Sequence, residues 1–354
     1  METEVVIAGA GPVGMALSIA LSNIGISNVV VERGAGVHPL PRAALIDAEL
    51  HQSFIVNGLG SRLEPLITPT RVAEYVDVRG KRLGGNDVSD VRVFGDLAPS
   101  SLHFQPEIDA MFLDELQKRG GRFMPETPFS GVEQGAEGVR LLLDNGDSVK
   151  GRWLVGCDGA ASTVRRAVGI DREDLGFEQD WLVVDVRLHD RSTSGLPDAA
   201  RQICDPVRPT TMISCHRDVY RWEFQLQPGE DPHEMNKPDN VWRLLSPWVG
   251  PANSDIIRSA SYRFHALVAT TFRHGNVFLA GDSAHQMPPF MGQGLNSGWR
   301  DVFNLAWKLR WVRDGIAGDA LLDTYGLERV HHSRVTVERS IEAGQLIDQF
   351  AGRV

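Results

Sequence analysis

Residues 4–32 constrain the fold of this chain more than any other segment. A short apolar run at 4–8 leads into the glycine-rich turn GAGPVG at 9–14, and helix-forming residues follow at 13–21. A second, β-branched run occupies 28–31. Parallel neighbouring strands need a crossover, which a helix usually supplies, so this order predicts a βαβ unit. We therefore expect a doubly wound α/β fold that opens with its parallel sheet.

The glycine spacing in this turn suits a dinucleotide. Gly9 allows the tight turn, Gly11 lets the backbone approach a pyrophosphate, and Gly14 permits close packing of the helix on the strand. The helix N-terminus then presents unpaired N–H groups to the phosphates. Glu32, which ends the second strand, can accept a hydrogen bond from a ribose hydroxyl and would repel a 2′-phosphate. The pattern indicates FAD or NAD rather than NADP, with an ordinary glycine turn as the alternative.

A second glycine-rich stretch, GDSAHQMPPFMGQGLNSG at 281–298, complements the first. Asp282 follows a predicted strand at 277–280 and could accept a hydrogen bond from a ribityl hydroxyl. The glycine-rich turn then enters an apolar helix, whose first amides could stabilise the negative charge of a reduced flavin at N1/O2. These amides belong to Gly294, Leu295 and Asn296. Together the two stretches point to flavin chemistry.

A third stretch, LVGCDGAASTVR at 154–165, has a strand that delivers Asp158 and Gly159. Small residues follow, and Ser162 is predicted to cap a helix that carries Arg165. Taken alone, this stretch is equally well explained as a strand-to-helix turn with its cap.

The middle of the chain changes from helical to alternating patterns. Residues 139–143 and 148–154 flank an Asn-Gly pair, which predicts a hairpin. Alternation at 181–188 and 220–226 predicts an antiparallel sheet over 176–262. We expect this sheet to be a substrate-binding domain inserted into an FAD-binding domain. That domain is then formed by 1–175, with a small excursion near 70–100 toward the substrate domain, and by 263–354.

Composition argues against several partners. A net charge of −10 disfavours nucleic acid and acidic membranes, and no run of 18 apolar residues could span a bilayer. The N-terminus enters a strand with no basic region or cleavage site, and the three cysteines lack CxxC spacing, so we expect a reducing, cytoplasmic setting. His331 and His332 lack further ligand spacing, so no metal site is predicted.

The three stretches, in this order, resemble the GxGxxG, DG and GD fingerprints of the group A FAD-dependent aromatic hydroxylases, the para-hydroxybenzoate hydroxylase-like family. The likeness to the family extends to the segments at 41–43, 103–106 and 266–274. Further likeness is to the 3-(3-hydroxyphenyl)propionate hydroxylase subgroup, in the segments at 204–211, 221–224, 262–266 and 281–298. The resemblance covers nearly the whole chain. It implies a Rossmann-like FAD-binding domain with a parallel sheet, plus an inserted substrate domain on a mainly antiparallel β-sheet. Members of the subgroup usually carry a further C-terminal stretch, so we expect a minimal member or a chain that lacks its C-terminal part.

The resemblance also implies roles for single residues. Pro288 would present its carbonyl near the substrate hydroxyl, and Asp47 would touch substrate or its proton relay, unless it is a solvated helix carboxylate. His285 is a further catalytic candidate, with a structural imidazole bonded to backbone as the alternative. Arg187, Arg208, Arg221 and Tyr220 could hold a carboxylate tail or simply pack on the strands. The cofactor-binding set comprises Gly9, Gly11, Pro12, Gly14, Glu32, Arg33, Arg42, Gln105, Asp158, Asp282, Gly292, Gly294, Leu295 and Asn296.

The implied reaction is ortho-hydroxylation of a small phenolic substrate by O2, through a flavin C4a-hydroperoxide, with bound FAD and transient NADPH or NADH. A 3-hydroxyphenylpropionate-like acid is one expected substrate. The alternatives are a tailoring hydroxylase of polycyclic aromatic polyketides and a flavin-binding protein without catalysis. The sequence leaves open the substrate, the choice of NADH or NADPH, and a homodimer as the assembly.

Overall fold

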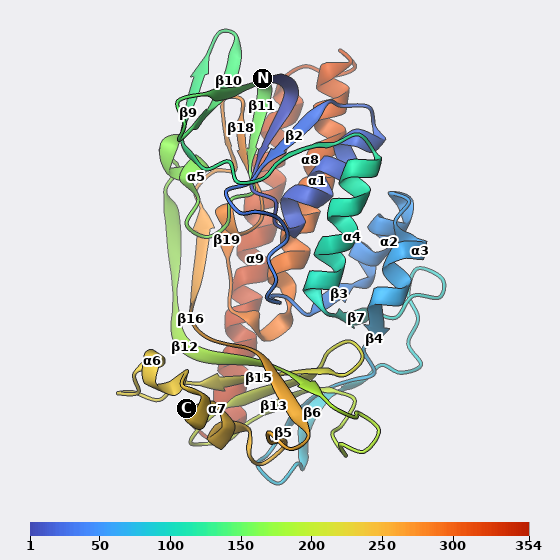
Figure 1. The fold of residues 1–354 in the computed structure, drawn as a ribbon, viewed down its shortest axis with the longest axis vertical. Coiled ribbons are helices and arrows are strands. Elements are labelled where there is room, and N and C mark those ends of the chain that lie inside the picture. The colour runs from blue at the N-terminus through green and yellow to red at the C-terminus, as the bar shows by residue number, and fades with distance from the viewer. Residues whose placement is uncertain (354) are drawn as a thin grey trace.

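In the computed structural model, which describes residues 1–353, the first of two large sheets lies at the same end of the molecule as the N-terminus (Figure 1). Its strand order is β17-β18-β11-β1-β2-β8, and β1 pairs in parallel with both β2 and β11. These strands are rich in Val, Ile and Leu and buried along most of their length, as expected where helices cover a parallel sheet. The bounds are β1 Glu2–Ala8, β2 Asn28–Val31, β8 Arg122–Met124, β9 Phe129–Gly135, β10 Gly138–Leu143, β11 Ser148–Gly156, β17 Arg273–His274 and β18 Val277–Leu279.

The second sheet is antiparallel except where β5 runs parallel to β13. Its order is β19-β16-β12-β15-β14-β13-β5-β6. The excursion expected near 70–100 thus supplies β5 and β6 to this sheet. The bounds are β5 Val72–Val76, β6 Arg82–Asp87, β12 Arg172–Leu188, β13 Ala200–Ile203, β14 Thr210–Ser214, β15 Val219–Gln225, β16 Ser254–Ala269 and β19 His285–Gln286.

A small third sheet and the helices complete the molecule. The sheet contains β3 Leu45–Asp47, β7 Ser100–His103 and β4 Ile67–Pro69. The helices are α1 Pro12–Asn23, α2 Ala48–Val56, α3 Gly60–Leu63, α4 Gln105–Lys118, α5 Thr163–Ala167, α6 Pro232–Met235, α7 Pro238–Leu245, α8 Gln293–Arg313 and α9 Ala320–Phe350, with short 3₁₀ turns η1 Glu64–Leu66, η2 Gly281–Ser283 and η3 Pro289–Met291. None of the helices within residues 1–353 has the length and apolar character needed to cross a membrane.

Two long strands, β12 and β16, connect the sheets. They run beside each other from the first sheet down into the second (Figure 1) and are paired over most of their length. The fold class predicted from the sequence is confirmed: an α/β part with a parallel sheet and a mainly antiparallel second part. The expected domain boundaries after 175 and 262 fall inside these two strands, and the division itself stays a prediction.

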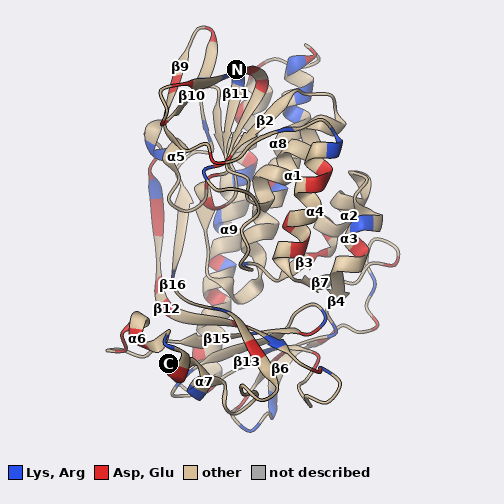
Figure 2. Ribbon diagram, viewed as in Figure 1, with Lys and Arg blue, Asp and Glu red and all other residues tan. Residues whose placement is uncertain are grey.

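Each sheet has its own core. The largest apolar cluster packs α1, α4, α8 and α9 against the first sheet, with Trp153 and Trp299 among its buried side chains. A second cluster covers one face of the second sheet, where Trp222 and Phe224 pack with α7. Figure 2 shows acidic and basic positions interspersed along the ribbon rather than gathered by sign.

Candidate cofactor site

The glycine turn is packed tightly on one side and open on the other. A Cβ on Gly9, which has φ +104°, would lie 2.5 Å from the Cys157 carbonyl oxygen. A Cβ on Gly14 would lie 2.1 Å from the Gly9 oxygen, whereas one on Gly11 would meet nothing within 4 Å. Helix α1 begins at Pro12 without a side-chain cap, so its first amides are free to face an anion. The turn fits a group that approaches the backbone at Gly11.

The three fingerprints converge at the carboxyl ends of β1, β11 and β18. A Cβ on Gly9 would be 3.0 Å from Asp158 Cα, which joins the first fingerprint to the second. A Cβ on Gly298 would be 2.7 Å from Val13 and 3.0 Å from Gly281 Cα, which joins the first to the third. Parallel strands β1, β11 and β18 are neighbours in the sheet, so the residues after them share one edge. In open α/β sheets this edge is where ligands bind.

Glu32 organises the end of β2. Its two oxygens accept hydrogen bonds from the backbone N–H groups of Ala10 and Gly34, each at 2.8 Å. The carboxylate therefore ties the glycine turn to the next loop, where Arg33 is exposed. Its predicted contact with a ribose stays a prediction.

Asp282 lies in the turn η2, at the end of β18. Surrounding protein raises the pKa of this carboxyl, against the opposing charges of His285 and Arg42, yet the residue is exposed. Asp282 is therefore accessible at the carboxyl end of β18. That placement fits the predicted role of Asp282 beside a bound cofactor.

A buried ionic cluster that sequence reasoning missed holds this turn. Asp301 of α8 accepts hydrogen bonds from Gly281 N at 2.9 Å and from Arg329 Nε of α9 at 2.7 Å, and its Oδ2 is 2.8 Å from His285 Nε2. Burial opposes ionisation of Asp301, but His285 and Arg329 outweigh it and keep the pKa of Asp301 below its ordinary value. An acid inside the apolar stretch of a predicted helix is the signal that could have revealed the cluster.

His285 is accordingly a buried member of this cluster. Its partner is a carboxylate rather than the backbone oxygen expected from the sequence, and Phe272 stacks near its ring. This placement favours a structural imidazole over a base that touches substrate.

The loop at 42–43 is held from two sides. Gln105 Oε1 accepts from Arg42 N at 3.1 Å and Ala43 N at 2.7 Å, while its Nε2 donates to Asp109 at 3.0 Å. Arg221 of the second sheet donates to the Arg42 carbonyl at 2.5 Å. Gln105 thus positions the loop, and the Arg42 side chain remains exposed. Contact of either side chain with a cofactor stays a prediction.

The start of α8 is joined to the same region. Gly292, with φ +63°, precedes the helix, which has no side-chain cap. Asn296 Nδ2 donates to the carbonyls of Gly292 and Leu45, and its Oδ1 accepts from Asp47 N. The side chain of Asn296 therefore fixes β3 against the helix N-terminus and leaves the first helical amides for a ligand.

The remaining acids act as caps. Asp47 accepts from Leu50 N at 3.0 Å as the N-cap of α2, and its other oxygen pairs with Arg300. Asp158 accepts from Ser162 Oγ at 2.6 Å and Thr163 N at 2.7 Å, at the start of α5, and burial raises its pKa. The predicted cap at Ser162 is present, since its oxygen accepts from Arg165 N.

Most of the side chains expected to hold a carboxylate tail of the substrate already have partners within the protein. Arg208 bonds Glu230 through both terminal nitrogens, and Arg221 pairs with buried Asp185 at 2.8 Å. Arg187 is half exposed with a loose 3.9 Å pair to Asp218, and Tyr220 packs in the apolar cluster on the other face of the sheet. Pro288, the predicted substrate contact, is buried immediately before η3.

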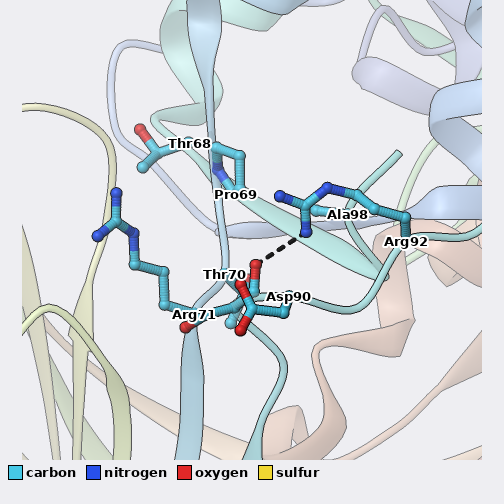
Figure 3. Close-up of a pocket in the computed structure, with 8 residues that line it drawn as sticks. Thr68, Pro69, Thr70, Arg71, Asp90, Arg92 and Ala98 are labelled. Atoms are coloured by element: carbon cyan, nitrogen blue, oxygen red, sulfur yellow. Dashed lines mark hydrogen bonds between the residues drawn. The ribbon is translucent and has the colours of Figure 1, made fainter. Parts of the chain in front are cut away.

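Two surface cavities lie away from the fingerprints. One of about 330 Å³ is lined by Thr68, Thr70, Arg71, Asp90 and Arg92 near β4 and β5; there Arg92 donates to the Ser89 carbonyl (Figure 3). The other, of about 760 Å³, lies beside α9 and the turn after β16. Neither contains a residue assigned to the cofactor.

Comparison with known proteins agrees with this site. A 3-(3-hydroxy-phenyl)propionate/3-hydroxycinnamic acid hydroxylase of Escherichia coli O139:H28 is 36% identical over 361 residues, covering 98% of this chain and 62% of the relative. The solved structure of p-nitrophenol 4-monooxygenase from Pseudomonas putida DLL-E4 has a TM-score of 0.87 and 25% identity, covering 97% of this chain and 88% of that one. Aklavinone-11 hydroxylase with FAD and aklavinone has a TM-score of 0.86 and 27% identity, covering 96% and 68%.

The chain thus spans 62% of the length of the curated relative. A family model described as FAD binding domain matches residues 2–340. The chain belongs to this FAD binding domain family.

Proposed function

We propose that the chain binds FAD along the edge where the three fingerprints meet and belongs to a monooxygenase that hydroxylates a phenolic ring. When bound, FAD supplies the redox chemistry, taking a hydride from NAD(P)H and activating O2 for transfer of one oxygen to the ring. The observation that carries the proposal is the convergence of Gly9, Asp158 and Gly281 beside the open backbone at Gly11.

Different residues bind different parts of the FAD and the substrate. The free amides of α1 and Gly11 hold the pyrophosphate, and Glu32 accepts from the ribose. Asp282 accepts from the ribityl chain, and the uncapped amides of α8 favour negative charge on the ring. Pro288 presents its carbonyl near the substrate hydroxyl.

The substrate proposed first is a 3-hydroxyphenylpropionate-like acid, hydroxylated ortho to its hydroxyl, because a hydroxylase named for that acid is 36% identical. A polycyclic aromatic polyketide is the second candidate, favoured by the likeness to the aklavinone-11 hydroxylase complex. We place the reaction in the cytoplasm, which suits the buried, unpaired thiols of Cys157, Cys204 and Cys215. A homodimer stays a prediction.

The test is FAD binding followed by substrate-stimulated NAD(P)H oxidation. Purified protein should be yellow or take up FAD, and 3-(3-hydroxyphenyl)propionate should accelerate NAD(P)H consumption and yield a catechol-type product. A tricyclic or tetracyclic phenol that stimulates instead would favour the second candidate. A colourless protein that cannot be reconstituted with FAD would contradict the proposal. Flavin binding without product from any phenol would restrict it to a non-catalytic flavoprotein.

Gly11→Ala should weaken FAD binding at least about tenfold, a cost near 1.4 kcal/mol, because the new methyl group occupies the open side where the backbone meets the pyrophosphate. The apoprotein should unfold at the unchanged temperature, since a Cβ on Gly11 meets nothing within 4 Å. Gly250→Ala, equally open but in the second part of the chain, is the matched control. Equal FAD affinity in both variants would place the pyrophosphate elsewhere.

A further inference from the structure

The second sheet turns one face toward the cofactor edge. Along β15, Tyr220, Trp222 and Phe224 enter the apolar cluster with α7, so the alternate residues point to the opposite side. We call this side the inner face. Strand pairing places on it, in register across β14, β15, β12 and β16, the residues Thr211, Ile213, Arg221, Glu223, Gln225, Trp181, Val183, Asp185, Arg258, Ala260 and Tyr262.

Two contacts fix where the inner face lies relative to the cofactor edge. At one end Arg221 donates to the carbonyl of Arg42, in the loop assigned to the cofactor. At the other end lies Trp181, which pairs with Gln225 across the strands. The centroid of its ring is 5.4 Å from that of Phe290, two residues after Pro288. Glu223 stands between Arg221 and Gln225 on the same strand. It therefore lies between the two segments expected to flank the ring and its substrate.

Glu223 is the acid of this face whose oxygens are uncommitted. Within residues 1–353 its carboxylate accepts no hydrogen bond, and its nearest cation, Arg221, is 4.0 Å away. Arg221 and Arg258 instead converge on Asp185, at 2.8 and 2.7 Å. Burial raises the pKa of Glu223, opposed by Arg221 and Arg258 and reinforced by Asp185. The Cys215 thiol, whose pKa Glu223 helps to raise, is a further titratable group near it.

We propose that Glu223 accepts a hydrogen bond from the hydroxyl of the phenolic substrate and takes its proton. This inference rests on the proposed function. The O–H bond of the phenol breaks, a new O–H bond forms on the carboxylate, and the ring keeps the electron pair as phenolate. Electron density then rises on the ring carbon ortho to the oxygen, where the proposed hydroxylation occurs. Asp47 is less suited to this step, because Leu50 N and Arg300 engage its oxygens.

Binding of 4-nitrophenol to the FAD-loaded protein tests the assignment, because its absorbance reports ionisation of the hydroxyl. Above the pKa of free nitrophenol, the wild-type complex must take up one proton, shared between ligand and Glu223. Its Kd should therefore rise about tenfold per pH unit. In Glu223→Gln no such proton is needed, so the Kd should be flat over the same range. Glu223→Asp should restore the slope, because it keeps a carboxylate.

Glu137→Gln is the matched control, since it makes the same substitution at an exposed position in the turn between β9 and β10, away from the inner face. It should keep the wild-type slope. A Glu223→Gln protein with bound FAD and an unchanged slope would overturn the role of Glu223 while leaving the proposed function intact. Failure of the wild-type protein to bind FAD would overturn both.

Discussion

His103 and Asp109 are two buried titratable groups with opposite displacements. Burial, with Arg221 and His216 nearby, lowers the pKa of His103 to about 3. Burial raises the pKa of Asp109 to about 7, against its hydrogen bond from Gln105 and the charge of Arg42. Both groups are therefore neutral in the folded protein across mildly acidic pH.

Between about pH 4 and 6.5, the pH dependences of their two contributions to the free energy of unfolding should cancel. Unfolded His103 binds a proton there and folded His103 does not, so its contribution to the free energy of unfolding grows as pH rises, by about 1.4 kcal/mol per unit. Folded Asp109 binds a proton there and unfolded Asp109 does not, so its contribution shrinks by the same amount. Asp109→Asn should make stability rise more steeply with pH than in wild type, and His103→Leu should do the reverse. Urea unfolding at several pH values measures both slopes; parallel curves for the three proteins would contradict the assignment.

Single residues were the least predictable part of the molecule. The sequence indicates that Glu32, Gln105 and Asp158 belong to the site, because each lies in a motif with a stated chemistry. It does not reveal that the amide oxygen of Gln105 accepts hydrogen bonds from the backbone of the 42–43 loop. That contact forms only when segments more than 60 positions apart come together in the fold. Glu223 was overlooked for the same reason: alternation shows that it shares a face with Arg221, but not which face meets the cofactor edge.

Helices α8 and α9 act together as a clamp on the turn at Gly281. Arg329 reaches across from α9 to the carboxylate on α8 that holds this turn, and Tyr325 donates to the Leu279 carbonyl at 2.6 Å. The clamp explains why the GD fingerprint needs residues nearly fifty positions beyond it.

Arg329→Met should lower the free energy of unfolding by about 3–5 kcal/mol, because it leaves the buried Asp301 charge without one of its partners. Arg339→Met, on the exposed side of the same helix, should change it by less than about 0.5 kcal/mol. Denaturant unfolding of the two variants beside wild type gives the comparison. A loss of similar size in both would mean that the Asp301 cluster contributes little.

Most helices and strands in which apolar residues recur at a regular spacing could be predicted, but their first and last residues could not. The strand at 28–31 and the helix after Gly11 match the structure within a few residues. The start of helix α9 at Ala320 is not evident from the sequence, because polar residues and Gly326 interrupt the apolar pattern there. Leu322 and Tyr325 nevertheless pack into the core.

Two long strands of the second sheet, rather than a flexible linker, connect it to the first part of the molecule. β12 and β16 extend into both parts, and Phe350 at the end of α9 packs on Tyr75 of the second sheet. Chain order predicts an insertion of this kind, but not that the end of β16 packs into the apolar core of the first part, because the pattern of a strand does not show which core each segment of it joins.

We therefore expect one cooperative unfolding transition instead of two. Calorimetric and van't Hoff enthalpies should agree, and circular dichroism should follow the same curve as tryptophan fluorescence. Trp153 in the first sheet and Trp222 in the second report on both parts. Two resolved transitions would mean that the long strands separate rather than couple the sheets.

The parallel sheet also sets an order of events during synthesis. β11 ends at Gly156, but its neighbour β18 begins only at Val277, about 120 residues later, which takes the ribosome about 6–24 s at typical rates. Throughout that interval residues 154–156 of this apolar strand have no partner on the edge that β18 later joins, and the nucleotide turn lacks the third fingerprint. Chaperone occupancy of ribosome-bound chains should therefore peak between these two points and fall once Asp282 and the α8 helix have emerged.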